Sequence, residues 1–191
     1  MKKIGIFPGS FNPVHIGHLA LANYILEYSD LDEIWMMVSP HNPLKDSGTL
    51  CSEDHRFNML SIALKNDPLI KPSDFEFTLE KPNYTVHTLN MLQKKHPNHH
   101  FSLIIGGDNW ANFHKWHRYK DILSQFSIIV YPRPDETIEK HFNLNNVHII
   151  NAPTMDISST MLRDSIKQHK DLRYFYPAGV YKYIQEHKLY L

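Results

Sequence analysis

The alternation of short apolar runs with longer, helix-like segments is the feature that most restricts the fold of this 191-residue chain. The apolar runs are rich in Ile and Val and lack strict apolar-polar alternation, which is typical of strands covered on both faces. Strands are expected at residues 3–7, 33–38, 101–105, 127–131 and 147–151. Helices are expected at residues 15–28, 53–66, 85–96, 115–125, 159–168 and 177–186. Strands that alternate with helices favour parallel pairing, so the pattern predicts an α/β fold with an open parallel sheet and helices on both faces.

Two further features bear on the domain organisation. Residues 75–79, with the sequence FEFTL, alternate apolar and polar side chains and are a candidate for a short additional strand. Turn-forming residues gather at 41–50, 133–146 and 169–176, but no repeat, low-complexity tract or linker divides the sequence. We therefore expect a single domain over residues 1–191.

Composition and charge exclude several classes of protein. Apolar residues make up 42% of the chain, which is enough for a folded core, and twenty Lys and Arg balance twenty Asp and Glu. A formal charge of zero does not suit a sequence-independent grip on nucleic acid or an anionic membrane, so neither is an expected partner. Any bound polyanion should be small. These features are compatible with a monomer or an oligomer.

The cellular setting is read from the cysteine count and the first residues. A single cysteine, Cys51, excludes an internal disulfide and favours a reducing compartment. The segment MKKIGIFPGSFNP is interrupted by glycine and proline, so it has the character of neither a signal peptide nor a membrane span. A cytoplasmic location is therefore expected.

The loops after the expected strands are where a ligand should bind, because open parallel sheets hold ligands beyond the carboxyl ends of their strands. Four of these loops carry unusual chemistry: PGSFNPVHIGH, SPHNPLKD, GGDNWANFHKWH and PTMDISSTMLR. In the first, Gly9 lets backbone approach a ligand closely, Ser10 and Asn12 offer donors, and Pro13 fixes the entry to a helix. The free N–H groups of that helix start attract negative charge.

Two histidines stand three residues apart in the first loop. His15 and His18 lie on one face of the first helical turn, where both imidazoles can donate hydrogen bonds to phosphate oxygens. Gly17 between them removes a side chain where a nucleotide would need room. The alternatives are two ordinary histidines at a helix start, or a zinc pair, which would need a third ligand and lacks the HExxH spacing.

The last loop offers more polar groups than a helix start needs. Ser158, Ser159 and Thr160 place three hydroxyls there, and Arg163 follows one turn later. A cap uses one hydroxyl, and the others, with the guanidinium and free N–H groups, suit a polyphosphate. The alternative is a serine cap followed by a solvent-facing arginine.

In combination these loops resemble the nucleotidyltransferase superfamily that carries (H/T)xGH near the N-terminus and ISSTxxR near the C-terminus. The signatures here are His15-Ile16-Gly17-His18 and Ile157-Ser158-Ser159-Thr160-Met161-Leu162-Arg163. The whole chain is similar to bacterial nicotinate-nucleotide adenylyltransferases, with further matches in EDHRFNML, NYTVHTL, IIGGDNWANFHKWHRYKDIL and YPAGVYKYIQEHKLY. The resemblance implies a Rossmann-like fold and, in NAD biosynthesis, the reaction of ATP with nicotinate mononucleotide to give nicotinate adenine dinucleotide and pyrophosphate, with Mg²⁺.

The resemblance also implies a role for particular residues. As catalytic residues it implies His15, His18 and Arg163. For ATP it implies Gly9, Ser10, Phe11, His15, His18, Ile157, Ser158, Ser159, Thr160 and Arg163. For the acceptor nucleotide it implies Asn12, Lys45, Tyr84, Thr85, Asp108 and Trp116. Magnesium would be held by phosphate oxygens and water, without a dedicated protein site.

The acceptor residues each have a plainer alternative. Trp116 is suited to stacking on a pyridine ring, but it could be a core or rim aromatic. Backbone N–H groups at Tyr84 and Thr85 could bind the nicotinate carboxylate, but Thr85 could be a plain N-cap. Asp108 could bind ribose hydroxyls or merely stabilise a turn.

One loop departs from the family pattern. The family has proline-proline-histidine-lysine after its second strand, whereas this chain has Asn42-Pro43-Leu44-Lys45. Lys45 remains a candidate phosphate contact, but Leu44 occupies the histidine position and puts the role of that imidazole in doubt. His55 and Arg56 match the family and could brace this loop, touch substrate or form a helix-surface pair.

Other functions remain as alternatives. A class I aminoacyl-tRNA synthetase shares the HIGH letters, but 191 residues without net charge leave no room for tRNA-binding domains. A phosphopantetheine or nicotinamide-mononucleotide adenylyltransferase would use a related frame with another acceptor. A non-catalytic nucleotide-binding module would bind ATP without releasing pyrophosphate.

Overall fold

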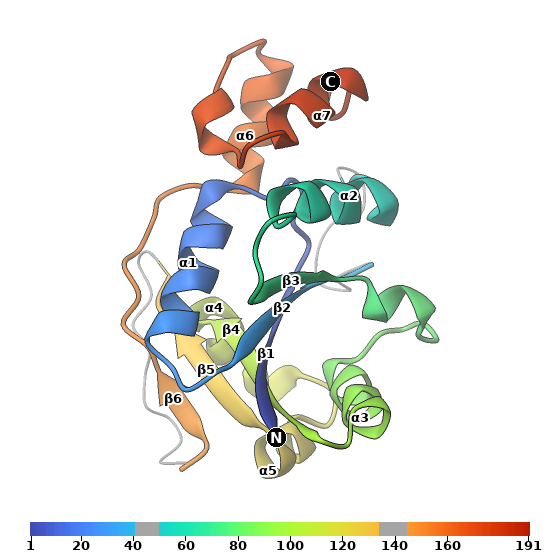
Figure 1. Cartoon of the computed structure of the whole chain (residues 1–191), viewed down its shortest axis with the longest axis vertical. Coiled ribbons are helices and arrows are strands. Elements are labelled where there is room, and N and C mark those ends of the chain that lie inside the picture. The colour runs from blue at the N-terminus through green and yellow to red at the C-terminus, as the bar shows by residue number, and fades with distance from the viewer. Residues whose placement is uncertain (41–49, 134–144) are drawn as a thin grey trace.

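The computed structural model describes residues 1–40, 50–133 and 145–191, and within these ranges the strands form one parallel sheet. The strands are β1 (Lys2–Gly9), β2 (Glu33–Val38), β3 (Ile70–Ser73), β4 (His99–Gly106), β5 (Ser127–Tyr131) and β6 (Val147–Ile149). They lie side by side in the order β3-β2-β1-β4-β5-β6, and every neighbouring pair is parallel (Figure 1). This is the strand order of the Rossmann fold, so the expected fold class is confirmed.

The helices follow the strands along the chain. They are α1 (Ile16–Glu27), α2 (Glu53–Ala63), α3 (Thr85–Lys95), α4 (Gly107–Ala111), α5 (Tyr119–Gln125), α6 (Ser159–Lys167) and α7 (Val180–Glu186). Short 3₁₀ helices cover Phe75–Thr78, Phe113–Lys115 and Arg173–Phe175. Figure 1 shows α6 and α7 together at one end of the molecule, near α1 and α2.

The core lies on both faces of the sheet, and the side chains of β5 show why. Ile128 and Val130 join a buried cluster that includes residues of α3 and α5, whereas Ile129 and Tyr131 join a second cluster with residues of α1, α2, α6 and α7. Each fully buried aliphatic side chain contributes about 1.5–3 kcal/mol relative to exposure. Because both faces must be apolar, the strand sequences read as continuous apolar runs.

The extra strand expected at residues 75–79 is wrong. The additional strand is β3, and residues 75–78 form a 3₁₀ helix. The carboxylate of Asp67 accepts hydrogen bonds from the backbone N–H groups of Leu69 and Ile70 and turns the chain into β3. Pro72 hides this strand in the sequence, yet β3 is an edge strand, where a missing N–H is tolerated.

The helix expected at residues 115–125 begins later than its pattern suggested. Arg118 has φ of 52°, in the left-handed region, so α5 begins only at Tyr119. Trp116 lies between the 3₁₀ helix Phe113–Lys115 and α5, with an extended backbone, φ −72° and ψ 145°. The tryptophan is therefore on a loop rather than in α5.

The switch point between β1 and β4, where the strand order reverses direction, provides the place for a ligand. These strands are neighbours at the centre of the sheet, and the chain leaves them toward opposite sides. In Rossmann sheets a crevice opens at this switch point, beyond the carboxyl ends of the strands.

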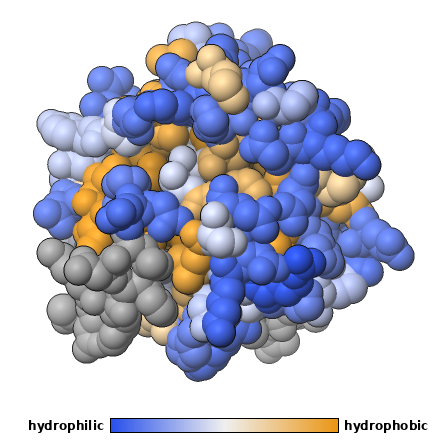
Figure 2. All heavy atoms as spheres, turned by 90° about the horizontal axis from the view of Figure 1, so that it is seen from below, coloured by the Kyte–Doolittle hydropathy of each residue, from blue (hydrophilic) through white to orange (hydrophobic). Residues whose placement is uncertain are grey.

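Figure 2 shows a largely polar face with apolar side chains between the polar ones. None of the helices in the described ranges has the length and apolar character needed to cross a membrane.

Candidate active site

A cavity of about 800 Å³ lies at the carboxyl ends of the central strands. Its lining contains all the expected site residues except Lys45, which lies outside the described residues. Those residues are Gly9, Ser10, Phe11, Asn12, His15, His18, Tyr84, Thr85, Asp108, Trp116, Ile157, Ser158, Ser159, Thr160 and Arg163. The structure brings these residues together, while their individual roles stay predictions.

The two signature loops are joined directly by hydrogen bonds. The Ser159 hydroxyl donates to the Pro13 carbonyl oxygen at 2.9 Å, and Nη1 of Arg163 donates to the Asn12 carbonyl oxygen at 2.8 Å. Nη2 of Arg163 also donates to Oγ1 of Thr160 at 3.1 Å. The alternative of a solvent-facing arginine is therefore wrong, because Arg163 bridges segments 151 residues apart.

The start of α6 uses its three hydroxyls differently. Ser158 is the N-cap, and its Oγ accepts from the Met161 N–H at 3.1 Å. Ser159 ties the loops, and Thr160 accepts from Arg163. One hydroxyl thus suffices for capping, as the sequence argument assumed. The first turn of α6 lines the cavity, and its exposed N–H groups carry the positive end of the helix dipole.

The histidine pair forms a stacked unit at the start of α1. His15 is the N-cap, and its ring centroid lies 3.7 Å from that of His18. The backbone N–H of His15 donates to Nδ1 of His18 at 3.2 Å. In a neutral imidazole one nitrogen accepts and the other carries the proton, so this bond places the proton of His18 on Nε2. His18 is thereby oriented as an N–H donor.

His15 is buried, which contradicts the alternative of an ordinary exposed histidine. Only 5% of its surface is exposed, and burial, with a smaller contribution from the charge of Arg133, lowers its pKa to about 4. Its Nδ1 is buried and has no partner among the described residues. A Cβ on Gly17 would lie 3.1 Å from this nitrogen, so the glycine leaves room for the His15 ring, and it also lines a smaller cavity.

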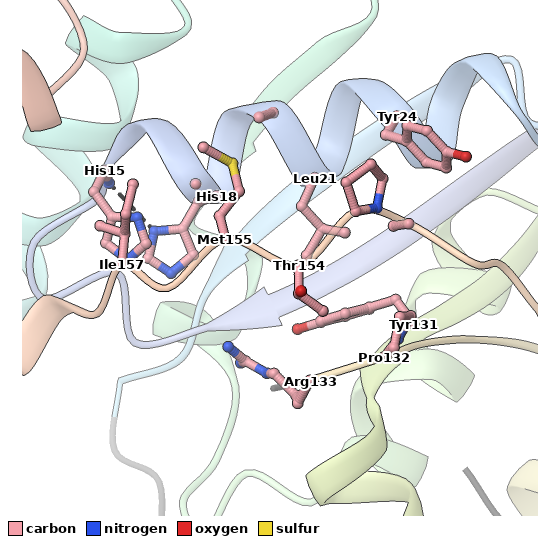
Figure 3. A pocket seen from close by; sticks show the side chains of 14 residues that line it. His15, His18, Leu21, Tyr24, Tyr131, Pro132, Arg133, Thr154, Met155 and Ile157 are labelled. Carbon is pink, nitrogen blue, oxygen red and sulfur yellow. Dashed lines mark hydrogen bonds between the residues drawn. The ribbon is translucent and has the colours of Figure 1, made fainter. Parts of the chain in front are cut away.

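A smaller cavity of about 280 Å³ adjoins the first (Figure 3). Leu21 and Tyr24 of α1 form one wall, and Tyr131 at the end of β5 and Arg133 just after it form another. Residues 152–155, Gly17 and Ile157 also line it, and His15 and His18 line both this cavity and the larger one. Figure 3 shows the Arg133 side chain directed toward the histidine pair. An apolar wall with an aromatic ring and a guanidinium suits a flat heterocycle.

Arg133 also links this cavity to Asp108. Its Nε lies 3.6 Å from Oδ1 of Asp108, and its guanidinium lies over the Tyr131 ring at 5.4 Å. Burial raises the pKa of Tyr131 to about 12. A Cβ on Gly106 would come within 2.5 Å of the Asp108 carboxylate, so a glycine is needed there for the close approach. Sequence reasoning missed Tyr131 and Arg133, although Tyr131 is the last residue of an expected strand and Arg133 follows two residues later.

The residues expected to contact the acceptor lie on α3 and on the loop before α5. Trp116 is half-buried, with its ring 5.2 Å from that of Phe113. The Tyr84 ring stacks on the His117 ring at 4.3 Å, which joins the two elements at the cavity. Tyr84 is the N-cap of α3 and Thr85 is its first residue, so the alternative of Thr85 as a plain N-cap is wrong.

Two residues of the first loop have structural contacts besides their expected roles. Oδ1 of Asn12 accepts from the Cys51 N–H at 3.1 Å, and the residue is 5% exposed. The ring of Phe11 is buried, 6.0 Å from the ring of Phe7 and 5.1 Å from that of His18. Asn12 therefore holds the loop to the segment before α2, and Phe11 anchors it in the core.

A buried acid in the cavity lining was not expected. Glu76 is 5% exposed, and its Oε1 accepts from the Thr88 hydroxyl at 2.9 Å. Burial raises its pKa. Asn83 donates through Nδ2 to the Glu76 carbonyl oxygen at 2.8 Å, so Glu76 connects the 3₁₀ helix to the segment before α3. The residue escaped notice because residues 75–79 resembled a strand.

Arg56 braces the loops. Its guanidinium donates to the carbonyl oxygens of Ser10, Ser39, Pro40 and Cys51 at 2.8–2.9 Å. The residue is completely buried, so the helix-surface alternative is wrong for it.

Comparisons with known proteins agree with this geometry. The cytidylyltransferase-like family model matches residues 6–165. A relative from Bacteroides fragilis named "Probable nicotinate-nucleotide adenylyltransferase" is 48% identical over 95% of this chain and 90% of its own. A relative of the same name from Flavobacterium psychrophilum is 48% identical over 98% of both chains.

A solved structure shows the same fold. It is the Plasmodium falciparum nicotinic acid mononucleotide adenylyltransferase complexed with NaAD, which superposes with a TM-score of 0.83 over 100% of this chain and 98% of its own, at 22% identity. Together, the family match and the identity with these relatives over nearly their full length show that the chain belongs to the cytidylyltransferase-like family and, within it, to the nicotinate-nucleotide adenylyltransferases, which are nucleotidyltransferase enzymes.

Proposed function

We propose that this chain transfers the adenylyl group of ATP to nicotinate mononucleotide. A phosphate oxygen of the acceptor attacks the α-phosphorus of ATP, a new P–O bond forms, and the bond to the oxygen bridging toward the β-phosphorus breaks. Nicotinate adenine dinucleotide and pyrophosphate result. The observation that carries the proposal is the convergence of the first turns of α1 and α6 on one cavity, tied by Ser159 and Arg163.

The chemistry requires alignment and charge neutralisation rather than a side-chain nucleophile. Two anions must approach each other, and negative charge develops on the leaving pyrophosphate. Nε2–H of His18, the hydroxyl of Thr160 and the guanidinium of Arg163 line the cavity as donors, beside the N–H groups of α6. Neutral His15 stacks against His18 and fixes its ring plane.

The two nucleotides have separate parts of the cavity in this proposal. The smaller cavity, with Tyr131 and Arg133, takes the adenine of ATP. Trp116 provides a face for the pyridine ring, and the N–H groups at Thr85 lie at the start of α3, where a carboxylate is favoured. Asp108 accepts from ribose hydroxyls, and Lys45 remains a proposed phosphate contact.

Magnesium fits this site as a companion of ATP. Among the residues that the structure describes, no three His, Cys, Asp or Glu side chains cluster as metal ligands. Asp108, about half exposed, is the carboxylate in the cavity that is accessible to an ion. Mg²⁺ retains its waters and binds phosphate oxygens, so it would offset phosphate charge with few protein ligands.

A cytoplasmic location stays an expectation from the single cysteine.

The test is pyrophosphate release from ATP and Mg²⁺, with each acceptor supplied separately. Nicotinate mononucleotide should support the highest kcat/KM, above nicotinamide mononucleotide, and phosphopantetheine should give the background rate. Release with phosphopantetheine alone would assign another acceptor. ATP binding without release with any acceptor would favour a non-catalytic module.

A further inference from the structure

Arg56 of α2 is a buried cation that the proposed chemistry does not use. None of its surface is exposed. Nε donates to the Cys51 carbonyl, Nη1 to the Ser10 and Ser39 carbonyls, and Nη2 to the Pro40 carbonyl. One guanidinium thus joins the loop after β1, the loop after β2 and the segment before α2.

Burying this charge costs free energy of hydration, so hydrogen bonds within the protein must offset that loss. An ion in a protein interior needs partners for its full hydrogen-bonding capacity. Arg56 makes no ion pair with a carboxylate in the described parts of the chain, and burial lowers its pKa although a guanidinium stays charged. Its partners are backbone carbonyl oxygens, whose orientation it therefore determines.

The orientation of one peptide unit matters for the cavity. The Ser10–Phe11 peptide is trans and planar, so its N–H points opposite to its C=O. Because the Ser10 carbonyl points at Arg56, the Phe11 N–H points away from the guanidinium. Ser10 and Phe11 line the cavity, whereas Arg56 does not.

The backbone conformation of Phe11 also indicates that the direction of this peptide unit is fixed by its surroundings. Its φ is 44°, in the left-handed region, which costs a non-glycine residue on the order of 1 kcal/mol. Such a conformation persists where surrounding contacts enforce it, and successive N–H groups in a tight turn form an anion-binding concavity. Arg56 and the buried Phe11 ring supply those contacts from opposite ends of the peptide unit.

We infer that Arg56 is a positioning residue that turns the Phe11 N–H toward a phosphate group in the cavity. The inference rests on the proposed function for the identity of the anion, and it assigns a role to a side chain that contacts no substrate. Arg56 acts by fixing the peptide dipole, and the same guanidinium binds the carbonyl oxygens of Ser39 and Pro40.

The first experiment uses inorganic pyrophosphate as the probe. In Arg56→Lys the charge remains, but an ammonium cannot reach all four carbonyl oxygens, so pyrophosphate Kd from calorimetry should rise on the order of tenfold. The KM for ATP should rise with it while kcat changes less. Ile62→Ala, on the same helix and packed against the core, is the control, with lower Tm and unchanged Kd. Binding by Arg56→Lys within twofold of wild type would overturn the inference.

A second experiment needs no variant and can overturn the inference even if Arg56→Lys does not fold, because it tests the Phe11 N–H contact on which the inference depends. In the ¹⁵N-labelled wild-type protein, pyrophosphate should shift the Phe11 amide proton downfield, as hydrogen bonding to an anion does. An unmoved Phe11 resonance at saturation would overturn the inference. Because the calorimetry and the NMR titration include no acceptor, a shifted amide with no pyrophosphate release in the acceptor assay would leave this role intact and refute the proposed function instead.

Discussion

His15 should make the stability of the folded protein depend on pH in mildly acidic solution. Its pKa falls from an ordinary 6.5 to about 4, chiefly because the ring is buried and to a smaller degree because of the charge of Arg133. Between these two values the unfolded chain binds a proton that the folded chain refuses, so lowering the pH favours unfolding. The linkage costs about 2 kcal/mol at pH 5 and roughly 3 kcal/mol below pH 4.

The assay is urea unfolding at pH 7.5 and pH 5.0, for wild type and His15→Asn. Other histidines also contribute to the pH dependence, so the useful quantity is the difference between the two proteins. Wild type should lose about 2 kcal/mol more than the variant between these pH values, because Asn does not titrate.

Two results would refute this reasoning. Equal losses in both proteins would show that burial of His15 does not suppress its protonation. An NMR titration in which the His15 Cε1 proton follows a pKa near 6.5 would show the same directly. The prediction therefore tests the packing of the ring independently of any catalytic role.

Three further predictions concern activity. His18→Ala should lower kcat by roughly 10²–10³-fold, as expected for one preorganised donor, with Tm nearly unchanged, and a near-normal kcat would count against the donor role. Trp116→Ala should raise the KM for nicotinate mononucleotide while leaving the KM for ATP similar, and the opposite pattern in steady-state kinetics would make it a packing residue. Arg133→Ala should raise the KM for ATP by about tenfold through loss of the cation beside Tyr131, whereas an effect confined to the acceptor would move the adenine elsewhere.

The parts of the fold with a repeated pattern were predictable. Strands buried on both faces and helices with clear starts leave periodic signals, so five strands and the two signature loops could be placed before any coordinates. The strand containing Pro72 could not, because its fitness as an edge strand depends on its neighbours. Likewise, the start of α5 depends on the left-handed backbone of Arg118, and an arginine in a sequence does not predict that conformation.

The candidate site was predictable in membership more than in geometry. Motif residues such as His18 and Thr160 carry their chemistry in the sequence, and the structure places them in one cavity. Arg133 and Glu76 belong to the lining only because of how β5 ends and how residues 75–78 coil. The burial of His15, which sets its pKa, likewise arises from tertiary packing.

The hydrogen bonds from Ser159 to Pro13 and from Arg163 to Asn12 span 146 and 151 residues. A ribosome releases the HIGH segment long before the residues that complete it, and β6 ends before α6 begins. Every strand of the described sheet is therefore synthesised while the nascent chain still lacks the donors that join the two signatures. The strands can therefore be present on the nascent chain before the two signatures are joined, and the joining waits for Ser159 and Arg163.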